Sequence, residues 1–274
     1  MELSKIMKRK IMDYLKEGKR FDGRAALDFR ALTIETGISK NAEGSARVKL
    51  GNTEVLVGVK MNVCVPYTDH EGEGTMITTA ELLPLSSDRF EPGPPGIESV
   101  ETARIVDRGL RESKFIDFEK LCIKEGEKVW GIFLDLYSLN ADGNLIDAFS
   151  IAAIAAILSA KMPKYDEVKG IVNYGEWTDQ SIPVTDKLPI NLTFHKIGKN
   201  ILLDPTREEE DSSEARLSLA LSRTNNKLYI NAAQKGGEEA FTEEELNEML
   251  DNAEKCYEKL EKEFKKHMER VKKA

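Results

Sequence analysis

The segment 145–161 is rich in alanine and isoleucine on nearly every helical face. A helix on the surface of a protein shows one apolar stripe and one polar face, so a helix that is apolar all round must be buried. Such a helix needs other elements packed against each of its sides. We therefore expect it to lie between layers of secondary structure, which limits the chain to a layered fold.

Strand-like patterns flank this segment on both sides. Val55, Val57 and Val59 occupy alternate positions, as is typical of a half-buried strand, and the preceding sequence 51–53, Gly-Asn-Thr, predicts a tight hairpin turn. Strands are predicted at 28–35, 45–50, 54–65, 77–83, 120–123 and 128–139, and after the buried helix at 168–173, 190–197, 200–203, 216–222 and 227–233.

Three more helices are expected. The first covers 1–16 and ends at Gly18, the second covers 99–115 after a loop rich in proline and glycine at 91–96, and the third covers 242–271. Thr242 followed by Glu245 predicts a capping box at the start of the last helix, with Leu246, Met249, Leu250, Tyr257, Leu260 and Phe264 as its apolar stripe. Because strands and helices are mixed along the chain, the predicted class is α+β.

The charge balance restricts contacts with nucleic acid. The chain of 274 residues has a formal net charge of −8, so it is not coated with positive charge. Phosphate contacts need Lys and Arg gathered on one face, and any contact with RNA must therefore be local.

Other residue types exclude several kinds of site. Cys64, Cys122 and Cys256 are far apart and odd in number, which predicts neither a disulfide framework nor a zinc ribbon. His70, His195 and His267 are equally scattered, so we assign no metal and no cofactor. The longest apolar run, 151–158, is too short to span a bilayer, and the N-terminus lacks the apolar stretch of a signal peptide. We expect a cytoplasmic protein that makes no contact with membranes.

Two motifs carry a resemblance to a known family. Residues 20–24, Arg-Phe-Asp-Gly-Arg, resemble the R-x-D-G-R signature of the RNase PH family, and residues 43–53 resemble its G-S-A-x-V-x-x-G-x-T hairpin. The first motif alone would indicate only a turn, but the order and spacing of the two are specific. The resemblance covers nearly the whole chain. It implies the RNase PH-like fold (ribosomal S5 domain 2-like) as a single domain over 1–274, with an N-terminal helix and two similar halves at about 20–165 and 166–274.

Within this family, residues 103–114 and 129–137 are most similar to the inactive subunit of the archaeal exosome. That resemblance implies a hexameric ring, a trimer of dimers in which such subunits alternate with catalytic RNase PH-like subunits. It also implies cap proteins with RNA-binding domains on one face of the ring, and single-stranded RNA as the molecule handled.

The resemblance also implies that the chain is not an enzyme. Active members open a buried helix with Gly-Gly-Thr-Arg, whose arginine and backbone amides hold the attacking phosphate. The matching stretch here is 142–148, which places Ile146 at the arginine position and Asp147, a repelling charge, beside it. Active members also carry an arginine pair near the start of the preceding helix, where this chain reads Gly-Ile-Glu-Ser at 96–99. We therefore assign no catalytic residue.

One acidic feature of active members is partly kept. They hold two aspartates about six residues apart, just before a Leu-Pro strand, for metal binding or acid and base chemistry. Asp179 and Asp186 precede Leu188 and Pro189 here, although their spacing differs. These residues are the main argument for the alternative that the chain is an active phosphate-dependent exoribonuclease. A third hypothesis is an RNA-binding or ribosome-associated protein that uses the fold without a ring.

Three arginines are the candidate RNA-binding residues. Arg104, Arg108 and Arg111 are spaced by four and three, which places them on one face of the predicted helix 99–115. Such a row can contact successive phosphates, or it can pair with neighbouring acids or with another subunit. For Arg20 and Arg24 we expect a structural role, with ion pairs to Asp22 or to a core carboxylate.

Overall fold

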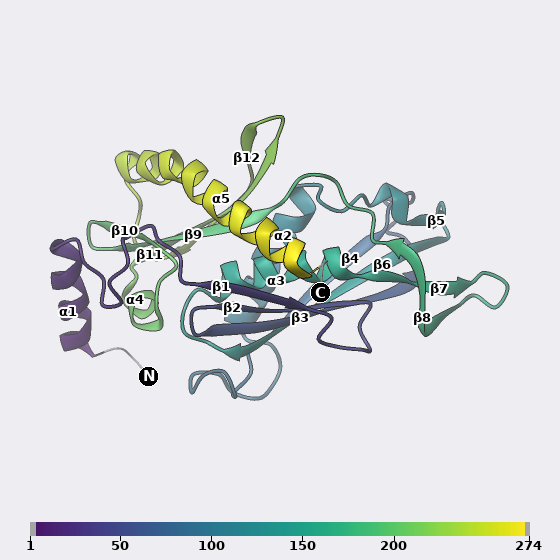
Figure 1. Cartoon of the computed structure of the whole chain (residues 1–274), viewed down its shortest axis with the longest axis horizontal. Coiled ribbons are helices and arrows are strands. Elements are labelled where there is room, and N and C mark those ends of the chain that lie inside the picture. The colour runs from purple at the N-terminus through teal and green to yellow at the C-terminus, as the bar shows by residue number, and fades with distance from the viewer. Residues whose placement is uncertain (1–3, 272–274) are drawn as a thin grey trace.

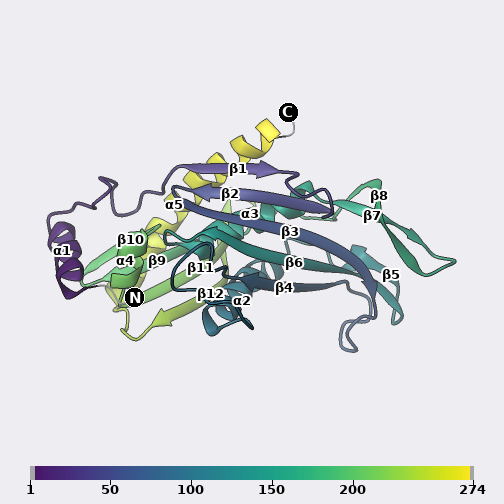
Figure 2. The ribbon, with the colours of Figure 1, turned by 90° about the horizontal axis from the view of Figure 1, so that it is seen from below.

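A computed structural model describes residues 4–271 of the chain, as two main sheets with helices between and across them (Figures 1 and 2). The larger sheet has the order β1-β2-β3-β6-β4, with β5 paired to β6, and the smaller has the order β10-β9-β11-β12. All pairs in these sheets are antiparallel except β4 with β6. The strands of the larger sheet are β1 (Leu32–Thr36), β2 (Gly44–Leu50), β3 (Thr53–Cys64), β4 (Thr75–Glu81), β5 (Cys122–Lys124) and β6 (Lys128–Asn140). Those of the smaller are β9 (Ile190–Ile197), β10 (Asn200–Leu203), β11 (Ala215–Thr224) and β12 (Lys227–Gly237).

The remaining elements cover the sheets or project from them. The helices are α1 (Lys5–Lys16), α2 (Ile97–Glu112), α3 (Leu145–Ser159), α4 (Arg207–Ser212) and α5 (Glu243–Val271), with a 3-10 turn at Glu119–Leu121. β7 (Lys161–Asp166) and β8 (Ile171–Ser181) form a hairpin at the end of the molecule opposite α1 (Figures 1 and 2). The predicted α+β class, with layered sheets and a long C-terminal helix, is confirmed.

The all-apolar segment forms α3, which lies between the two sheets and is buried on all sides. Every residue from Leu145 to Ile157 is buried, and the helix packs on β2 and β3 on one side and on β9 on the other. Gly44 of β2 allows this close packing, because a Cβ there would collide with the backbone of Ala156. The prediction of a buried central helix is confirmed, with its end at Ser159.

The β2–β3 hairpin shows how the alternating pattern builds this core. Gly51 adopts φ 60° in the turn, and Leu50 pairs with Thr53, so Thr53 already belongs to β3. Val55, Val57 and Val59 are all fully buried against α3. Burial of each such side chain stabilises the fold by roughly 1.5–3 kcal/mol before the cost of ordering is counted.

The terminal helices dock on this core in different ways. In α1, Ser4 accepts a hydrogen bond from the Met7 N–H at 3.2 Å, while residues 1–3 of the predicted helix lie outside the described residues. In α5, Thr242 and Glu245 form the predicted capping box, with bonds of 2.9 and 3.2 Å. The apolar stripe of α5 is narrower than predicted, since Leu246 and Leu250 are 37% and 42% exposed. Because α5 packs on both β1 and β9, it ties the two sheets together.

Some elements differ from their predictions. β7 was not predicted, because its sequence contains Pro163, and proline is normally excluded from the interior of a sheet. α4 was missed because it is only six residues long and mostly acidic. β1 starts at Leu32, four residues later than expected, and the residues before it form a connecting loop. Within residues 4–271, no helix combines the length and the apolar character needed to cross a membrane.

Candidate functional site

The N-terminus of α3 is the position at which the family resemblance places phosphate. Asn144 precedes the helix in the left-handed conformation, with φ 55°. Ile146 lies in the first turn and is only 6% exposed. Its hydrocarbon side chain offers neither charge nor a hydrogen bond to an anion.

Asp147 plays a different part from the one expected. Its carboxylate is fully buried and accepts hydrogen bonds from the Thr193 backbone N–H at 3.1 Å, the Thr193 hydroxyl at 2.7 Å and the Asn144 amide at 3.2 Å. It therefore joins α3 to β9 and does not face an incoming anion. Burial raises the pKa of Asp147 to about 7, so its charge is weakened near neutral pH.

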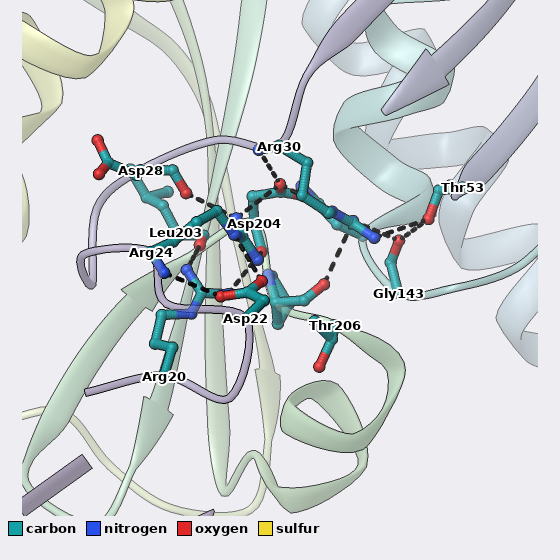
Figure 3. A network of polar contacts seen from close by, with 12 residues as sticks. Arg20, Asp22, Arg24, Asp28, Arg30, Thr53, Gly143, Leu203, Asp204 and Thr206 are labelled. Carbon is teal, nitrogen blue, oxygen red and sulfur yellow. Dashed lines mark hydrogen bonds and ion pairs between the residues drawn. The ribbon is translucent and has the colours of Figure 1, made fainter. Parts of the chain in front are cut away.

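Beside this helix end, Asp204 is the centre of a polar network (Figure 3). Its buried carboxylate accepts from the Arg24 guanidinium at 3.0 Å, the Asn144 amide at 2.9 Å and the Arg30 guanidinium at 2.7 and 2.9 Å. The Arg30 backbone N–H also donates to it, at 2.7 Å. Asp204 follows β10, Asn144 precedes α3, and the arginines lie in the connection before β1, so one carboxylate joins three segments that are distant in sequence.

The two arginines of the 20–24 motif are internal. Arg20 and Glu209 form an ion pair whose side chains are 1% and 3% exposed, and Arg20 also donates to the Leu203 and Asp204 carbonyls at 3.0 and 2.8 Å. Arg24 pairs with Asp22 at 2.7 Å as well as with Asp204. The predicted structural role is confirmed. Sequence reasoning missed Arg30, Asp204 and Glu209, because their partners lie more than 170 residues away in the chain.

Other charged side chains around the start of α3 also form ion pairs with each other. Arg216 of β11 pairs with Glu101 of α2 at 2.6 Å, and Arg89 pairs with Asp211 at 2.9 Å. Glu210 is partly exposed as a residue, but its carboxyl end is enclosed by neighbouring groups. This burial and the charge of Glu98 raise the pKa of Glu210 to about 7, although the Asn144 backbone N–H and nearby arginines favour its charged form. The surroundings therefore supply paired arginines and additional carboxylates.

The two candidate aspartates do not meet at this position. Asp179 is exposed on β8, and Ser181 of that strand pairs with Lys161, just past the C-terminal end of α3. The two ends of this 15-residue helix are about 22 Å apart. Asp186 is exposed in a loop that is tied to the end of α2 by the Thr185 N–H and the Phe115 carbonyl, 2.8 Å apart. Among the described residues, no group of three or more His, Cys, Asp or Glu side chains is arranged to hold a metal ion.

The arginine row lies on α2, but its members differ in what they contact. Arg104 is exposed and has no ion pair to residues 4–271, whereas Arg108 is exposed and donates to the Gln234 side chain at 3.3 Å. Arg111 is half-buried, pairs with Asp107 at 3.1 Å and donates to the Met76 carbonyl at 2.9 Å. Arg104 and Arg108 are therefore the two members available to a ligand.

Comparison with known proteins agrees with this geometry. Residues 28–163 match the model for domain 1 of the 3' exoribonuclease family, RNase PH, and residues 187–256 match domain 2. The chain is 45% identical to "Exosome complex component Rrp42" of Methanothermobacter thermautotrophicus, over 89% of each chain. It is 44% identical to the protein of the same description in Pyrococcus furiosus, over 94% of this chain and 92% of the relative.

Solved structures give the same relationship. A chain from a structure titled "archaeoglobus fulgidus exosome with RNA bound to the active site" superposes with a TM-score of 0.86 at 40% identity, covering 94% of this chain and 98% of that one. A chain from "Archaeal exosome core" gives a TM-score of 0.83 at 38% identity, covering 95% and 96%. Both structures are of archaeal exosomes. The resemblance seen in the two motifs is thus confirmed over most of the sequence, and the chain belongs to the RNase PH family of 3' exoribonucleases.

Proposed function

We propose that this chain is a non-catalytic, RNA-positioning subunit of a hexameric archaeal-type exosome ring. Three copies alternate with three catalytic RNase PH-like sister subunits, and each copy completes the active site of its sister. Cap proteins with RNA-binding domains cover one face of the ring, and the assembly works on single-stranded RNA in the cytoplasm. The relatives described as exosome components, and the related structure with RNA bound, support this assignment.

The observation that carries the non-catalytic assignment is that none of the described residues 4–271 supplies an available cation at the start of α3. Phosphorolysis brings an inorganic phosphate against a phosphodiester, so fixed positive charge must offset the repulsion of two anions. Here Ile146 is buried hydrocarbon, and Arg24, Arg30 and Arg216 are held by carboxylates of the same chain. An incoming phosphate would have to displace those internal partners.

Release of nucleoside diphosphate tests this assignment. The purified chain is incubated with a short RNA and inorganic phosphate, alone and with a catalytic sister subunit from a related archaeon. We expect no nucleoside diphosphate from the chain alone, and faster release from the mixture than from the sister alone. Release by the chain alone would establish the alternative, an active exoribonuclease. Failure of the two proteins to assemble would contradict the ring.

The RNA-positioning part of the proposal rests on the exposed arginines of α2. Arg104 and Arg108 lie on the same helical face and can approach adjacent phosphates, whereas Arg111 is largely engaged with Asp107. We expect Arg108→Glu to weaken RNA binding by the assembled ring and to make the dependence of affinity on salt shallower, by about one unit of logarithmic slope. The matched control is Lys262→Glu, the same charge change at an exposed position of α5.

We also infer that the chain acts as one domain with two similar halves, at about 20–165 and 166–274. The two family models divide the chain in nearly the same place. The contacts of α5 with both sheets, and the Asp204 network, support joint folding of the halves. A single unfolding transition seen by both circular dichroism and tryptophan fluorescence is the expected result, and two separate transitions would contradict it.

A further inference from the structure

The first helix of the protein, α1, carries a surplus of positive charge. Residues 4–19 hold six lysines and arginines against two acids, a balance of +4 in a chain whose net charge is −8. Both acids are already paired. Asp13 pairs with Lys16 at 2.9 Å. Glu17 pairs with Lys19 at 3.2 Å. The surplus therefore belongs to the cations in the first half of the helix.

Three of those cations are exposed and have no ion pair within the described part of the chain, namely Lys5, Arg9 and Lys10. Lys8 lies among them and reaches Glu214 at 3.7 Å. The first turn of α1 has no acid, and positive charge there is unfavourable because the free N–H groups of a helix N-terminus carry partial positive charge. α5 shows the favourable arrangement, with three acids in its first turn. The cations of α1 thus do not stabilise their own helix, and an anionic partner offsets their repulsion.

Two aromatic rings stand beside these cations. Tyr14 and Phe21 are 45% and 47% exposed, and their ring centroids are 4.6 Å apart with an angle of 48° between the planes. Tyr14 follows Lys10 by one helical turn, so the ring and the ammonium group share one row of the helix surface. Single-stranded nucleic acid is typically held by such a combination, in which cations follow the phosphates and exposed rings stack on the bases.

The inward face of α1 is used in folding. Ile11 and Leu15 are 2% and 5% exposed. They pack on Ile197 of β9 and Leu202 of β10, in a small apolar cluster separate from the main core. A helix that lies on a membrane buries its main apolar face in the bilayer. That face of α1 is filled by the protein itself, so the outward cations and rings suit RNA better than a lipid surface.

α1 lies apart from the arginines of α2. It sits at the end of the molecule opposite the β7–β8 hairpin (Figures 1 and 2). Its apolar contacts are with β9 and β10, whereas α2 contacts mainly β11 and β12. In a sheet of order β10-β9-β11-β12, the outer strands are three strand spacings apart, about 14 Å. One nucleotide cannot contact both helices, so any RNA on α1 is a different segment from the RNA on α2.

From these features we propose that Lys5, Arg9, Lys10, Tyr14 and Phe21 form a second RNA-binding surface, the α1 surface. It holds a segment of single-stranded RNA apart from the segment that α2 positions, with phosphates against the cations and a base against the rings. This inference rests on the RNA-positioning role proposed above and goes beyond it, because it gives the ring an additional contact with long RNA.

Binding of a fluorescent 30-nucleotide single-stranded RNA to the ring reconstituted with a catalytic sister tests the α1 surface. The double change Arg9→Glu and Lys10→Glu makes two phosphate contacts repulsive. We expect roughly a tenfold loss of affinity and a shallower dependence on salt, by about one to two units of logarithmic slope. The matched control is Lys262→Glu with Lys266→Glu, the same charge change at two exposed lysines of α5, and it should leave affinity unchanged.

Tyr14→Ala tests the aromatic part independently of charge. Loss of one stacking ring should lower affinity for the same RNA by about fivefold or more. Tyr14 lies on the helix surface and alanine is a good helix former, so α1 should stay folded, as circular dichroism would show. Tyr174→Ala, at a tyrosine 54% exposed on β8, is the matched control and should leave affinity unchanged.

The outcomes separate the α1 surface from the proposed function. If Arg108→Glu weakens binding and neither variant of α1 does, the α1 surface is rejected and the RNA-positioning role remains. If none of these changes affects binding, both are rejected. Combining Arg108→Glu with the double change should multiply the two losses, because the two helices contact separate segments. A combined loss no greater than the larger single loss would overturn the proposal.

A labelling experiment tests whether a protein covers the α1 surface instead. With Arg9→Cys, the introduced thiol should react with maleimide in the assembled ring and be protected by the 30-nucleotide RNA, as followed by peptide mass mapping. Val168→Cys, at a residue 98% exposed in the β7–β8 turn, is the control that RNA should not protect. Protection by assembly or by a cap protein without RNA would identify the α1 surface as a protein contact and overturn the proposal.

Discussion

Two groups of arginines in this molecule have opposite relations to their surroundings. Arg20, Arg24 and Arg30 lie beside the start of α3 and are held by Glu209 and Asp204. Arg104 and Arg108 stand on the outer face of α2 and have no carboxylate partner within residues 4–271. The comparison shows that the presence of arginine does not by itself create an anion site. The first group stabilises the fold, and of the two groups only the second can contact phosphate without breaking internal ion pairs.

The largest expected effect breaks the first group. Asp204→Asn keeps the shape of the side chain and tolerates its left-handed backbone, φ 49°, but it removes the charge that Arg24 and Arg30 share. Loss of one partner from a buried ion pair costs about 3–5 kcal/mol. We expect the free energy of unfolding in guanidinium chloride to fall by about that amount. Asp13→Asn removes an exposed pair with Lys16, which solvent screens, so it should lower stability far less than Asp204→Asn does. Equal losses for the two variants would contradict the central role of Asp204.

Changes to the second group should leave stability nearly unaffected and should lower RNA affinity. The double change Arg104→Glu and Arg108→Glu alters exposed side chains without carboxylate partners, so stability should stay within about 0.5 kcal/mol. RNA affinity of the reconstituted ring should fall by roughly 10- to 100-fold, because two phosphate contacts become repulsive. Arg111→Gln is the intermediate case, because it breaks the pair with Asp107. It should lower the free energy of unfolding more than the double variant does, and it should lower RNA affinity less. If the double variant unfolds far more easily and binds RNA normally, the two groups do not differ as described.

These contrasts also mark what the sequence could and could not predict. The apolar run of α3 and the alternation of Val55, Val57 and Val59 are local patterns, and both placed their elements correctly. The substitution at Ile146 could be found because a family motif fixes the position to compare. The Asp204 network could not be predicted in this way. Nothing in the sequence around Asp204 indicates that its carboxylate will contact arginines more than 170 residues earlier in the chain. The engagement of Arg111 with Asp107 was visible as helical spacing, yet only the structure distinguishes it from the unpaired Arg104.

A smaller effect concerns two buried titratable groups near α3. Burial lowers the pKa of His195 from 6.5 to about 3, and burial raises the pKa of Asp147 from 3.8 to about 7. The unfolded His195 binds a proton that the folded one refuses, so its contribution is lost as the pH falls from about 6.5 towards 3. The folded Asp147 keeps a proton that the unfolded one releases, so its contribution is lost as the pH rises from about 4 to 7.

The two contributions oppose each other up to about pH 6.5, and above it only that of Asp147 still changes. We expect His195→Gln to weaken the loss of stability in acid, and Asp147→Asn to remove a loss of roughly 2–3 kcal/mol between pH 5 and pH 8. Unfolding free energies measured by denaturant at pH 5, 6, 7 and 8 would show both trends. Identical pH profiles for wild type and Asp147→Asn would mean that this carboxyl group titrates normally.

The smallest expected effect is the response of stability to inorganic phosphate. A ligand present at tenfold its dissociation constant stabilises the folded state by about 1.4 kcal/mol. Since the arginines around α3 are paired internally, phosphate at millimolar concentration should give no more stabilisation than chloride at equal ionic strength, apart from any that Arg104 and Arg108 provide. If phosphate stabilises the wild type and the Arg104→Glu, Arg108→Glu variant equally, an anion site separate from α2 exists, and the internal pairing of the first group does not exclude phosphate. If the variant loses that stabilisation, the anion binds on α2 and the contrast between the two groups becomes sharper.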